Sequence, residues 1–254
     1  MLPFFQLTVI PLGFVNIQAW GLLVASGLLF GTWMSARQAK KLGFNPKLVW
    51  DFAFWTFLAA FLGARLFHVL FYDLNHYLAN PIDAINPALP GFSVMGGFIG
   101  ASLTVTLLIR KHKLPFLKFA DSAIFGLPFG LMIGRIGCFL IHDHPGVECA
   151  SNPLCVIYPD GIARHDHGLY LSLLGAFIST IFLLFNRKPR PQGFYLALFI
   201  TIYSIVRFFL DFYRIIDIRY FHLTPTQWLL IPLAALGIWL LGKIIKGTFK
   251  MNNA

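Results

Sequence analysis

Long apolar runs separated by short polar segments set the pattern of the sequence. Seven runs approach the roughly 20 residues that an α-helix needs to span a bilayer. They lie at about 15–36, 50–72, 91–109, 119–141, 167–185, 193–213 and 226–245. Each run predicts a helix, because a helix satisfies its own backbone hydrogen bonds in lipid. The pattern therefore predicts an all-α polytopic membrane protein with seven transmembrane helices.

The composition agrees with this fold class and excludes several others. Of the 254 residues, 57% are hydrophobic and only 12% are charged, about half the charged share of an average soluble domain. The 28 Phe and 6 Trp are too many for the surface of a soluble globule, so a disordered chain, a coiled coil and a cytosolic enzyme are excluded. We expect one domain over residues 1–254, with outer loops 73–90 and 142–166 forming a small periplasmic cap. The first run is not expected to be a cleavable signal, since no basic segment precedes it.

The basic residues predict the orientation of the chain. The net charge of +10 would suit a nucleic-acid partner, but basic residues of polytopic proteins gather in cytoplasmic loops, so no such partner is expected. Fourteen of the 20 fall on one side of the predicted helices, and they are Arg37, Lys40, Lys41, Lys47, Arg110, Lys111, Lys113, Lys118, Arg187, Lys188, Arg190, Lys243, Lys246 and Lys250. Only Arg164, Arg214 and Arg219 lie beyond the opposite ends. Seven spans with this bias place the N-terminus outside and the C-terminus in the cytoplasm.

Three arginines lie inside predicted spans, at similar depth. Arg65, Arg135 and Arg207 each precede the outer end of their span by about six or seven residues, which is roughly 10 Å. An arginine within the membrane is costly and indicates function. The guanidinium fork suits the phosphate oxygens of a phospholipid, so we expect all three to bind substrate. A structural ion pair or snorkelling is the alternative, above all for Arg65, which precedes Tyr72 and Asp73 by one or two turns.

Small residues surround Arg135. Glycines recur every three or four residues and share one helical face, and they are Gly126, Gly130, Gly134 and Gly137. Such a face lets helices pack closely. It could also let a ligand reach both the guanidinium of Arg135 and exposed backbone, which makes Gly134 and Gly137 candidate binding residues.

A polar stripe crosses the sixth predicted span. Tyr203, Arg207, Asp211 and Arg214 are spaced by four, four and three residues and therefore share a face of an otherwise apolar helix. The stripe could pair only with itself, but that alternative does not need the tyrosine one turn deeper. We expect all four residues to contribute to substrate binding.

The outer connection after the fourth span and the start of the fifth hold four of the eight histidines. It contains His142-Asp143-His144 and later Arg164-His165-Asp166-His167. A metal site is the weaker interpretation, because adjacent residues alone do not converge on an ion. General acid–base chemistry is favoured, with aspartate orienting a histidine, and the candidates are His142 and His165. A solvated loop without a role is the alternative for His144 and His167.

The three cysteines separate into a pair and a single residue. Cys149 and Cys155 flank Ala-Ser-Asn-Pro-Leu in an outer loop, where Asn and Pro favour a turn. A disulfide between them is expected if this loop faces an oxidising compartment. Cys138 is predicted to be unpaired within a helix.

These motifs resemble those of the prolipoprotein diacylglyceryl transferases, seven-helix enzymes of the bacterial inner membrane. The resemblance runs through most of the chain. It rests on Gly63-Ala-Arg65 to Phe71-Tyr72, Met95-Gly96-Gly97-Phe-Ile-Gly100, Gly134-Arg135-Ile-Gly137, Arg164-His165, Leu169-Tyr170, Tyr203-Ser-Ile-Val-Arg207, Asp211 and Thr226-Gln227. It implies transfer of the diacylglyceryl group of phosphatidylglycerol to the cysteine thiol of a prolipoprotein lipobox, with release of glycerol 1-phosphate. It implies no metal and no cofactor, and a multi-pass protein of the cell inner membrane.

The resemblance also implies residue roles. Arg135 would bind phosphatidylglycerol, and Arg207 would be required together with Tyr203 and Asp211. The paired Gly96 and Gly97 would lie at the substrate.

The sequence departs from the family pattern at three positions. Met95, Cys138 and Leu171 stand where the family usually has His, Asn and Glu. The missing histidine is a favoured proton acceptor in the family, so His142, or secondly His165, is expected to replace it. An acceptor other than a lipobox thiol is an alternative, as are a non-catalytic lipid-binding protein and a transporter or anion channel.

Overall fold

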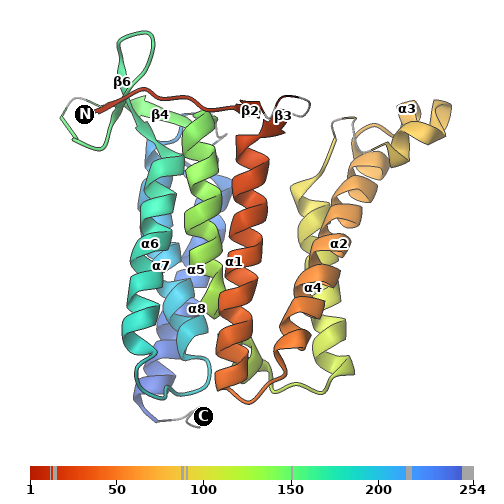
Figure 1. Cartoon of the computed structure of the whole chain (residues 1–254), viewed down its shortest axis with the longest axis vertical. Coiled ribbons are helices and arrows are strands. Elements are labelled where there is room, and N and C mark those ends of the chain that lie inside the picture. Colours follow the sequence, from red (N-terminus) through yellow and green to blue (C-terminus); the bar gives the residue numbers. More distant parts are fainter. Residues whose placement is uncertain are drawn as a thin grey trace. The chain divides into compact units, whose positions relative to one another are not determined.

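A computed structural model of the chain describes residues 1–11, 13, 16–86, 89, 91–149, 151–215 and 219–247. This part is mostly helical (Figure 1). Its α-helices are α1 (Ala19–Lys41), α2 (Pro46–Phe71), α3 (Leu74–Ala79), α4 (Val94–Lys111), α5 (Phe116–Ile141), α6 (His167–Phe185), α7 (Phe194–Leu210) and α8 (Pro225–Ile245). Two 3₁₀ helices, η1 (Pro81–Ile85) and η2 (Asp211–Tyr213), complete the helical elements. Val15 of the first predicted span, Lys250, and positions 87, 88, 90 and 150 of the predicted outer loops lie outside the described residues.

Six helices of the described part are long and apolar enough to cross a membrane. They are α1, α2, α5, α6, α8 and the stretch of α7 that η2 continues to Tyr213. Each coincides with a predicted run. The remaining run, 91–109, corresponds to α4, which is a helix of 18 residues whose last turn carries Arg110 and Lys111. The structure therefore supports a multi-pass helical membrane protein with six spans of sufficient length and apolarity.

The chain divides into two compact units, which are described separately. One comprises residues 45–116 and the other comprises 1–44 with 117–254. In the unit of 45–116, α4 packs closely on α2: a Cβ added to Gly63 would lie 2.6 Å from the carbonyl oxygen of Gly96, and one added to Gly97 would lie 3.4 Å from that of Ala60. The expected binding residues Gly96 and Gly97 thus lie at a helix–helix contact, which requires glycine at position 96, whereas a Cβ at position 97 would be in ordinary van der Waals contact.

The glycine face of α5 is a second close contact. A Cβ added to Gly27 of α1 would lie 2.7 Å from the carbonyl oxygen of Gly130, and one added to Gly137 would lie 3.3 Å from Cα of Trp20. The backbone at Gly130 and Gly137 is therefore covered by α1, and the expectation that a ligand reaches it there is wrong. Gly134 has more room, since its nearest neighbour is Val24 at 4.0 Å.

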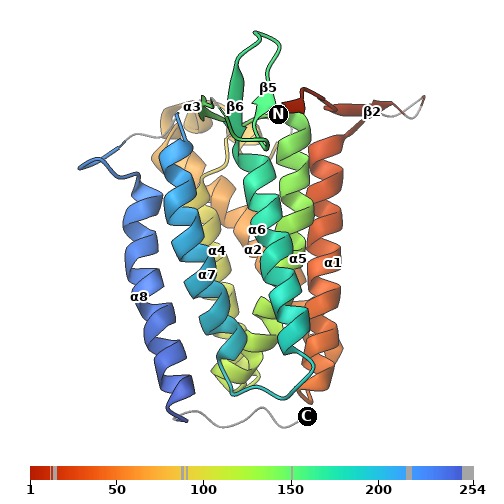
Figure 2. The same ribbon diagram turned by 90° about the vertical axis from the view of Figure 1, so that its left-hand side faces the viewer.

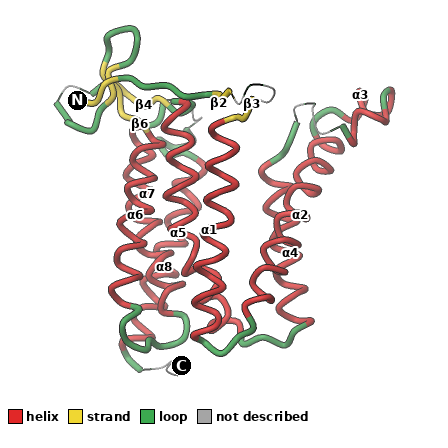
Figure 3. Tube along the Cα trace, in the orientation of Figure 1, coloured by secondary structure: helices red, strands yellow, loops and turns green. Residues whose placement is uncertain are grey.

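The larger unit also contains two small sheets at the end where α6 begins (Figures 2 and 3). Four strands pair in the order β1 (Leu2–Pro3), β5 (Val156–Ile157), β6 (Ala163–Asp166) and β4 (Pro145–Glu148), and β2 (Val9–Pro11) pairs with β3 (Asn16–Gln18). A disulfide joins Cys149 and Cys155, with an S–S distance of 2.01 Å. The prediction of helices alone missed these strands, because they are too short to show a period in the sequence.

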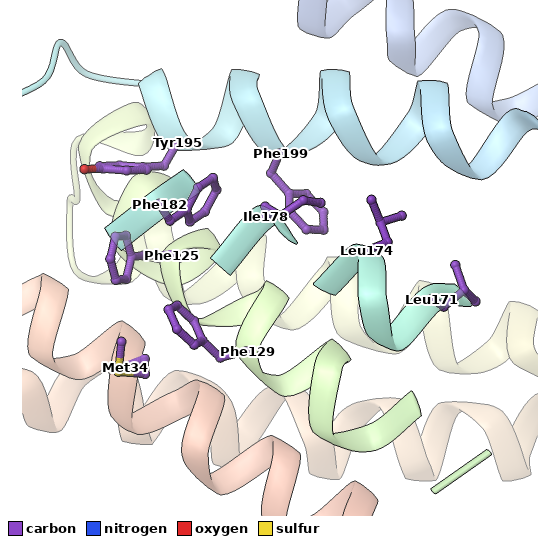
Figure 4. Close-up of a cluster of buried hydrophobic side chains, with 9 residues drawn as sticks. All are labelled: Met34, Phe125, Phe129, Leu171, Leu174, Ile178, Phe182, Tyr195 and Phe199. Atoms are coloured by element: carbon purple, nitrogen blue, oxygen red, sulfur yellow. The ribbon is translucent and has the colours of Figure 1, made fainter. Parts of the chain in front are cut away.

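A buried apolar cluster holds α1, α5, α6 and α7 together (Figure 4). It is formed by Met34, Phe125, Phe129, Leu171, Leu174, Ile178, Phe182, Tyr195 and Phe199. Asp121 of α5 adds a buried polar contact: its carboxylate accepts hydrogen bonds from the backbone N–H groups of Gly193 at 2.7 Å and Leu196 at 3.0 Å. A carboxylate at a helix N-terminus is favourable, so Asp121 fixes the start of α7 and with it the helix that carries Arg207.

Candidate active site

Arg207 is a buried arginine with an unused donor. It lies in the last turn of α7 and is 7% exposed. Its Nη2 pairs with Oδ1 of Asp211 at 2.8 Å, whereas its Nη1 has no hydrogen-bond partner among the described residues. Leaving a buried donor unpaired costs about 1–3 kcal/mol. Nη1 of Arg207 is therefore available to a hydrogen-bond acceptor of a ligand.

Asp211 holds Arg207 in place. Its Oδ2 accepts a hydrogen bond from Oγ1 of Thr224 at 3.3 Å. Thr224 caps α8 in a capping box with Gln227, and Nε2 of Gln227 donates back to the carbonyl oxygen of Phe208 at 3.0 Å. A carboxylate this close to the guanidinium would repel a phosphate. We therefore revise the expected role of Asp211 from substrate binding to positioning of Arg207.

Arg135 and Arg214 add positive charge beside Arg207, and the charges of both act on it. Arg135 is half-buried, and Nη1 donates to Sγ of Cys138 at 3.9 Å, a long contact. Nη1 of Arg214 lies 4.0 Å from Oδ1 of Asp211. Arg207 and Arg214 thus share the carboxylate of Asp211. With the further charge of Arg135, the excess positive charge suits an anionic ligand.

The stripe on α7 is only partly self-paired. Asp211 engages Arg207 and Arg214, as the self-pairing alternative requires, but it leaves Nη1 of Arg207 unused. One turn deeper, Tyr203 stacks on Phe199 with ring centroids 5.3 Å apart. Its phenol is therefore held by packing close to Arg207.

Arg65 has a different role from the other arginines. All five of its N–H donors reach backbone carbonyl oxygens of the segment after η1 or of η1 itself. Nε donates to Ala84 at 3.0 Å, Nη1 to Leu89 at 3.3 Å and Gly91 at 3.0 Å, and Nη2 to Asp83 at 2.5 Å and Asn86 at 3.3 Å. No donor remains for a phosphate, so the expected substrate-binding role of Arg65 is corrected to a structural one.

We expect Arg65→Lys to weaken the hydrogen bonding of η1 and the residues that follow it, without removing a catalytic group. A lysine has three donors, so at least two of the carbonyl oxygens lose their partner. Hydrogen exchange at the amides of Ala84 and Asn86 should accelerate about tenfold or more, as expected for losing one or two hydrogen bonds. Arg110→Lys is the matched control, and equal exchange in the two variants would contradict the structural role.

His142 has no free nitrogen. Its Nδ1 lies 2.7 Å from Oδ2 of Asp166, and its Nε2 lies 3.1 Å from the carbonyl oxygen of Phe5, which can only accept. Its ring also stacks on Phe4 at 4.5 Å. Both ring nitrogens are therefore engaged in hydrogen bonds. His142 therefore ties the N-terminal segment to Asp166, an arrangement that favours a structural role over the expected role of general base.

Asp166 is the centre of this structural cluster. Its Oδ1 caps α6 by accepting from the N–H of Leu169 at 3.0 Å, and its Oδ2 also accepts from the hydroxyl of Tyr158 at 3.2 Å. Burial, and then the Asp166 carboxylate, raise the pKa of Tyr158, which remains a donor at neutral pH.

We expect His142→Asn to lower stability rather than to remove a base. His142 adopts φ of 50°, a conformation that asparagine tolerates, so the variant isolates the loss of the ring. Removing one partner of a buried pair costs about 3–5 kcal/mol. Thermal unfolding in detergent should therefore shift down by several degrees relative to His144→Asn. A variant with unchanged unfolding and a changed pH–rate profile would restore the base assignment.

His165 is positioned by aromatic residues. Its Nδ1 lies 2.6 Å from the hydroxyl of Tyr170 and 3.7 Å from Sγ of Cys155, and its ring stacks on Tyr213 at 4.3 Å. Burial lowers the pKa of His165, so its ring is uncharged at neutral pH.

His167 is a buried histidine near Arg207 that sequence reasoning did not select as a candidate. It is 2% exposed, and its ring nitrogens form no side-chain hydrogen bond among the described residues, although the backbone of Tyr213 lies close enough to interact with the ring. The charges of Arg207 and Arg214 act on it, as do Asp166 and the backbone of Tyr213. The available signal was helical periodicity: His167 precedes the buried Leu171 by four residues, so both lie on the face of α6 that meets α7.

Two groups of potential metal ligands occur in the described residues. Cys149, Cys155 and His165 form one, but both sulfur atoms belong to the disulfide and are not thiolates. Cys138, Asp143 and His144 form the other, within 4.8 Å. The guanidinium of Arg135 contacts Cys138, and its charge opposes a cation there.

A comparison with known proteins identifies the family. The family model described as prolipoprotein diacylglyceryl transferase matches residues 7–242. The chain belongs to the prolipoprotein diacylglyceryl transferase family. It is 33% identical over 242 residues to the phosphatidylglycerol–prolipoprotein diacylglyceryl transferase of Nitratidesulfovibrio vulgaris (strain DP4), covering 91% of this chain and 92% of that one. It is 33% identical over 244 residues to the Pseudomonas paraeruginosa enzyme of the same name, covering 91% of each, and 32% identical over 265 residues to that of Neisseria gonorrhoeae (strain NCCP11945), covering 92% and 94%.

The three departures from the family pattern fall in different environments. Met95, where the transferase family usually has histidine, lies in the first turn of α4 and is 64% exposed. Leu171, in place of glutamate, is 1% exposed and belongs to the apolar cluster. Cys138, in place of asparagine, is buried beside Arg135. Two ionisable groups of the family are therefore replaced by apolar side chains.

Proposed function

We propose that the protein transfers the diacylglyceryl group of phosphatidylglycerol to the cysteine thiol of a prolipoprotein and releases glycerol 1-phosphate. The observation that carries this proposal is the buried, unpaired Nη1 of Arg207 beside the charges of Arg135 and Arg214. The names of the relatives supply the two substrates. Arg207 and Arg135 would donate hydrogen bonds to phosphate oxygens of the lipid. Arg214 and Tyr203 would line the same site.

The reaction breaks one bond and forms one. The thiol sulfur attacks the C3 carbon of the diacylglyceryl group, and an S–C3 bond forms. The bond between C3 and the oxygen that links it to phosphorus breaks. Its electron pair stays on that oxygen, so the phosphate of the released glycerol 1-phosphate carries one more negative charge than it did in the lipid. Arg207 and Arg135 would stabilise this developing charge. Electrostatic stabilisation of this kind is usually the largest single contribution to catalysis.

The thiol proton needs an acceptor, and we assign it to His167. An uncharged imidazole is the form of histidine that accepts a proton. The ring nitrogens of His167 have no side-chain hydrogen bond among the described residues and meet only the backbone of Tyr213. In contrast, both nitrogens of His142 are occupied and Nδ1 of His165 is bonded to Tyr170. His167 is also the histidine on which Arg207 acts. His165 then positions the β6–α6 junction through Tyr170 and Tyr213.

We further propose the seven-span topology of a bacterial inner-membrane protein, with the N-terminus outside. The ends of α1, α4 and α8 carry Lys40, Lys41, Arg110, Lys111 and Lys243, and the α6–α7 connection carries further basic residues. This distribution follows the rule for cytoplasmic ends if α4 is the seventh span. The loop with the disulfide then faces the oxidising side.

The test is an assay of the purified protein in vesicles of phosphatidylglycerol with a lipobox peptide. We expect the peptide to gain the mass of a diacylglyceryl group and glycerol 1-phosphate to appear. A peptide with serine in place of cysteine, and vesicles of phosphatidylethanolamine, are the controls. Lipid binding without any product would instead favour the non-catalytic lipid-binding alternative.

A further inference from the structure

A basic pocket lies in the larger unit, at the end of its helices opposite Arg207. It has a volume of about 340 Å³ and is lined by the end of α1, the α6–α7 connection and the start of α7. The lining residues are Gln38, Lys41, Leu42, Asn186, Arg187, Lys188, Pro189, Arg190 and Tyr195. Four of them are cationic and none is acidic. The volume is at the lower end for ligand sites and suits a small headgroup.

The four cations of this pocket have no acidic partner among the described residues, and the side chain of Arg190 is fixed in position. None of Lys41, Arg187, Lys188 and Arg190 forms an ion pair within the described part of the chain. Nε of Arg190 donates to the carbonyl oxygen of Phe185 at 3.1 Å, and its guanidinium lies 4.7 Å from the ring centroid of Phe185. The side chain is thereby fixed, which reduces the entropy lost when it binds an anion.

Gln38 is the independent sign of a ligand. It is 4% exposed, and its Oε1 has no hydrogen-bond partner among the described residues. A solvated basic loop, the ordinary explanation for cytoplasmic lysines and arginines, does not account for a buried acceptor without a donor. A ligand that fits this pocket therefore carries a hydrogen-bond donor for Gln38 next to the anionic group that the cations attract.

We propose that this pocket binds the phosphoglycerol headgroup of a second phosphatidylglycerol molecule, away from the active site. The phosphate would lie among Arg187, Lys188 and Arg190, and a glycerol hydroxyl would donate to Oε1 of Gln38. An ammonium-bearing headgroup is disfavoured by the four positive charges. A phosphodiester without hydroxyls would satisfy the cations and leave Gln38 unpaired.

The experiment counts lipids bound to the full chain by native mass spectrometry. An Arg207→Ala background removes the proposed active-site lipid, so that the pocket is observed alone. Phosphatidylglycerol is compared with phosphatidylmethanol, which has equal charge and no hydroxyl, and with soluble glycerol 1-phosphate. We expect phosphatidylglycerol to bind about tenfold more tightly than phosphatidylmethanol, as one hydrogen bond to a buried group predicts.

Two variants assign the contacts. The double variant Arg187→Gln/Lys188→Gln should weaken both lipids about tenfold or more, whereas Lys40→Gln, an exposed residue in the same turn as Lys41, should not. Gln38→Leu should erase the preference for phosphatidylglycerol and leave phosphatidylmethanol unchanged. Equal weakening by Lys40→Gln, a preference that survives Gln38→Leu, or soluble glycerol phosphate binding as tightly as the lipid would overturn the proposal. A second lipid retained despite Arg207→Ala would count against the proposed active site and not against this pocket.

Discussion

Arg207→Lys is expected to abolish diacylglyceryl transfer almost as completely as Arg207→Ala. Lysine keeps the charge, but it lacks the planar fork with which arginine reaches Asp211 through Nη2 and a phosphate oxygen through Nη1. Loss of one group that stabilises developing charge lowers kcat by about 10²–10³-fold. The measurement is the initial rate of lipobox peptide modification at saturating phosphatidylglycerol.

Arg219→Lys provides the matched control, because Arg219 is an exposed arginine of the same unit whose Nη2 donates only to backbone oxygens of Phe212 and Arg214. Its rate should stay close to that of the wild type. Thermal unfolding should show that both Arg207 variants fold. An Arg207→Lys protein that keeps more than about a tenth of the activity would show that charge alone is enough, against the bidentate role.

His167→Ala is the second large effect, and it should lower kcat by about 10²-fold or more while leaving the apparent affinity for phosphatidylglycerol unchanged. The wild-type rate should fall on the acid side, where a histidine base becomes protonated, and this limb should be absent in the variant. The groups that face His167 are Arg207, Arg214, Asp166 and the backbone of Tyr213. They are unchanged in the variant, so the lost limb would report the ring itself.

Added imidazole gives a readout that a structural role would not move. The substitution empties a buried site, so free imidazole should partly restore the rate of His167→Ala and have no effect on His142→Asn. If His142→Asn loses the acid limb and His167→Ala keeps it, the assignment of the proton acceptor is reversed.

The sequence predicts the helices well because their length and apolarity are local properties. It also predicts where Arg135 and Arg207 lie, since depth follows from counting along a helix. The partners of polar side chains are different, because they come from remote segments. His142 contacts Phe5, 137 residues away, and the glycines of α5 meet those of α1. Arg65 resembles Arg207 in its place within a predicted span, but its hydrogen-bond partners are carbonyl oxygens up to 26 residues further along the chain.

His167 is a second residue whose surroundings could not be predicted from the sequence. In the sequence it is one of two histidines flanking Asp166, and its neighbour His165 carries the family motif. Only the packing of α6 on α7 buries His167 beside the backbone of Tyr213 and exposes it to the charge of Arg207. Its importance therefore depends on a contact between helices that no local pattern records.

The most direct test of the account is the stoichiometry of the reaction. Glycerol 1-phosphate and diacylglyceryl peptide should be quantified together, with the wild type and with the Arg135→Ala and Arg207→Ala variants. The account predicts equal amounts of both products from the wild type, none without the peptide thiol, and neither product above about a hundredth of the wild-type rate from the variants. Release of glycerol phosphate without peptide modification, or full activity in either variant, would contradict it.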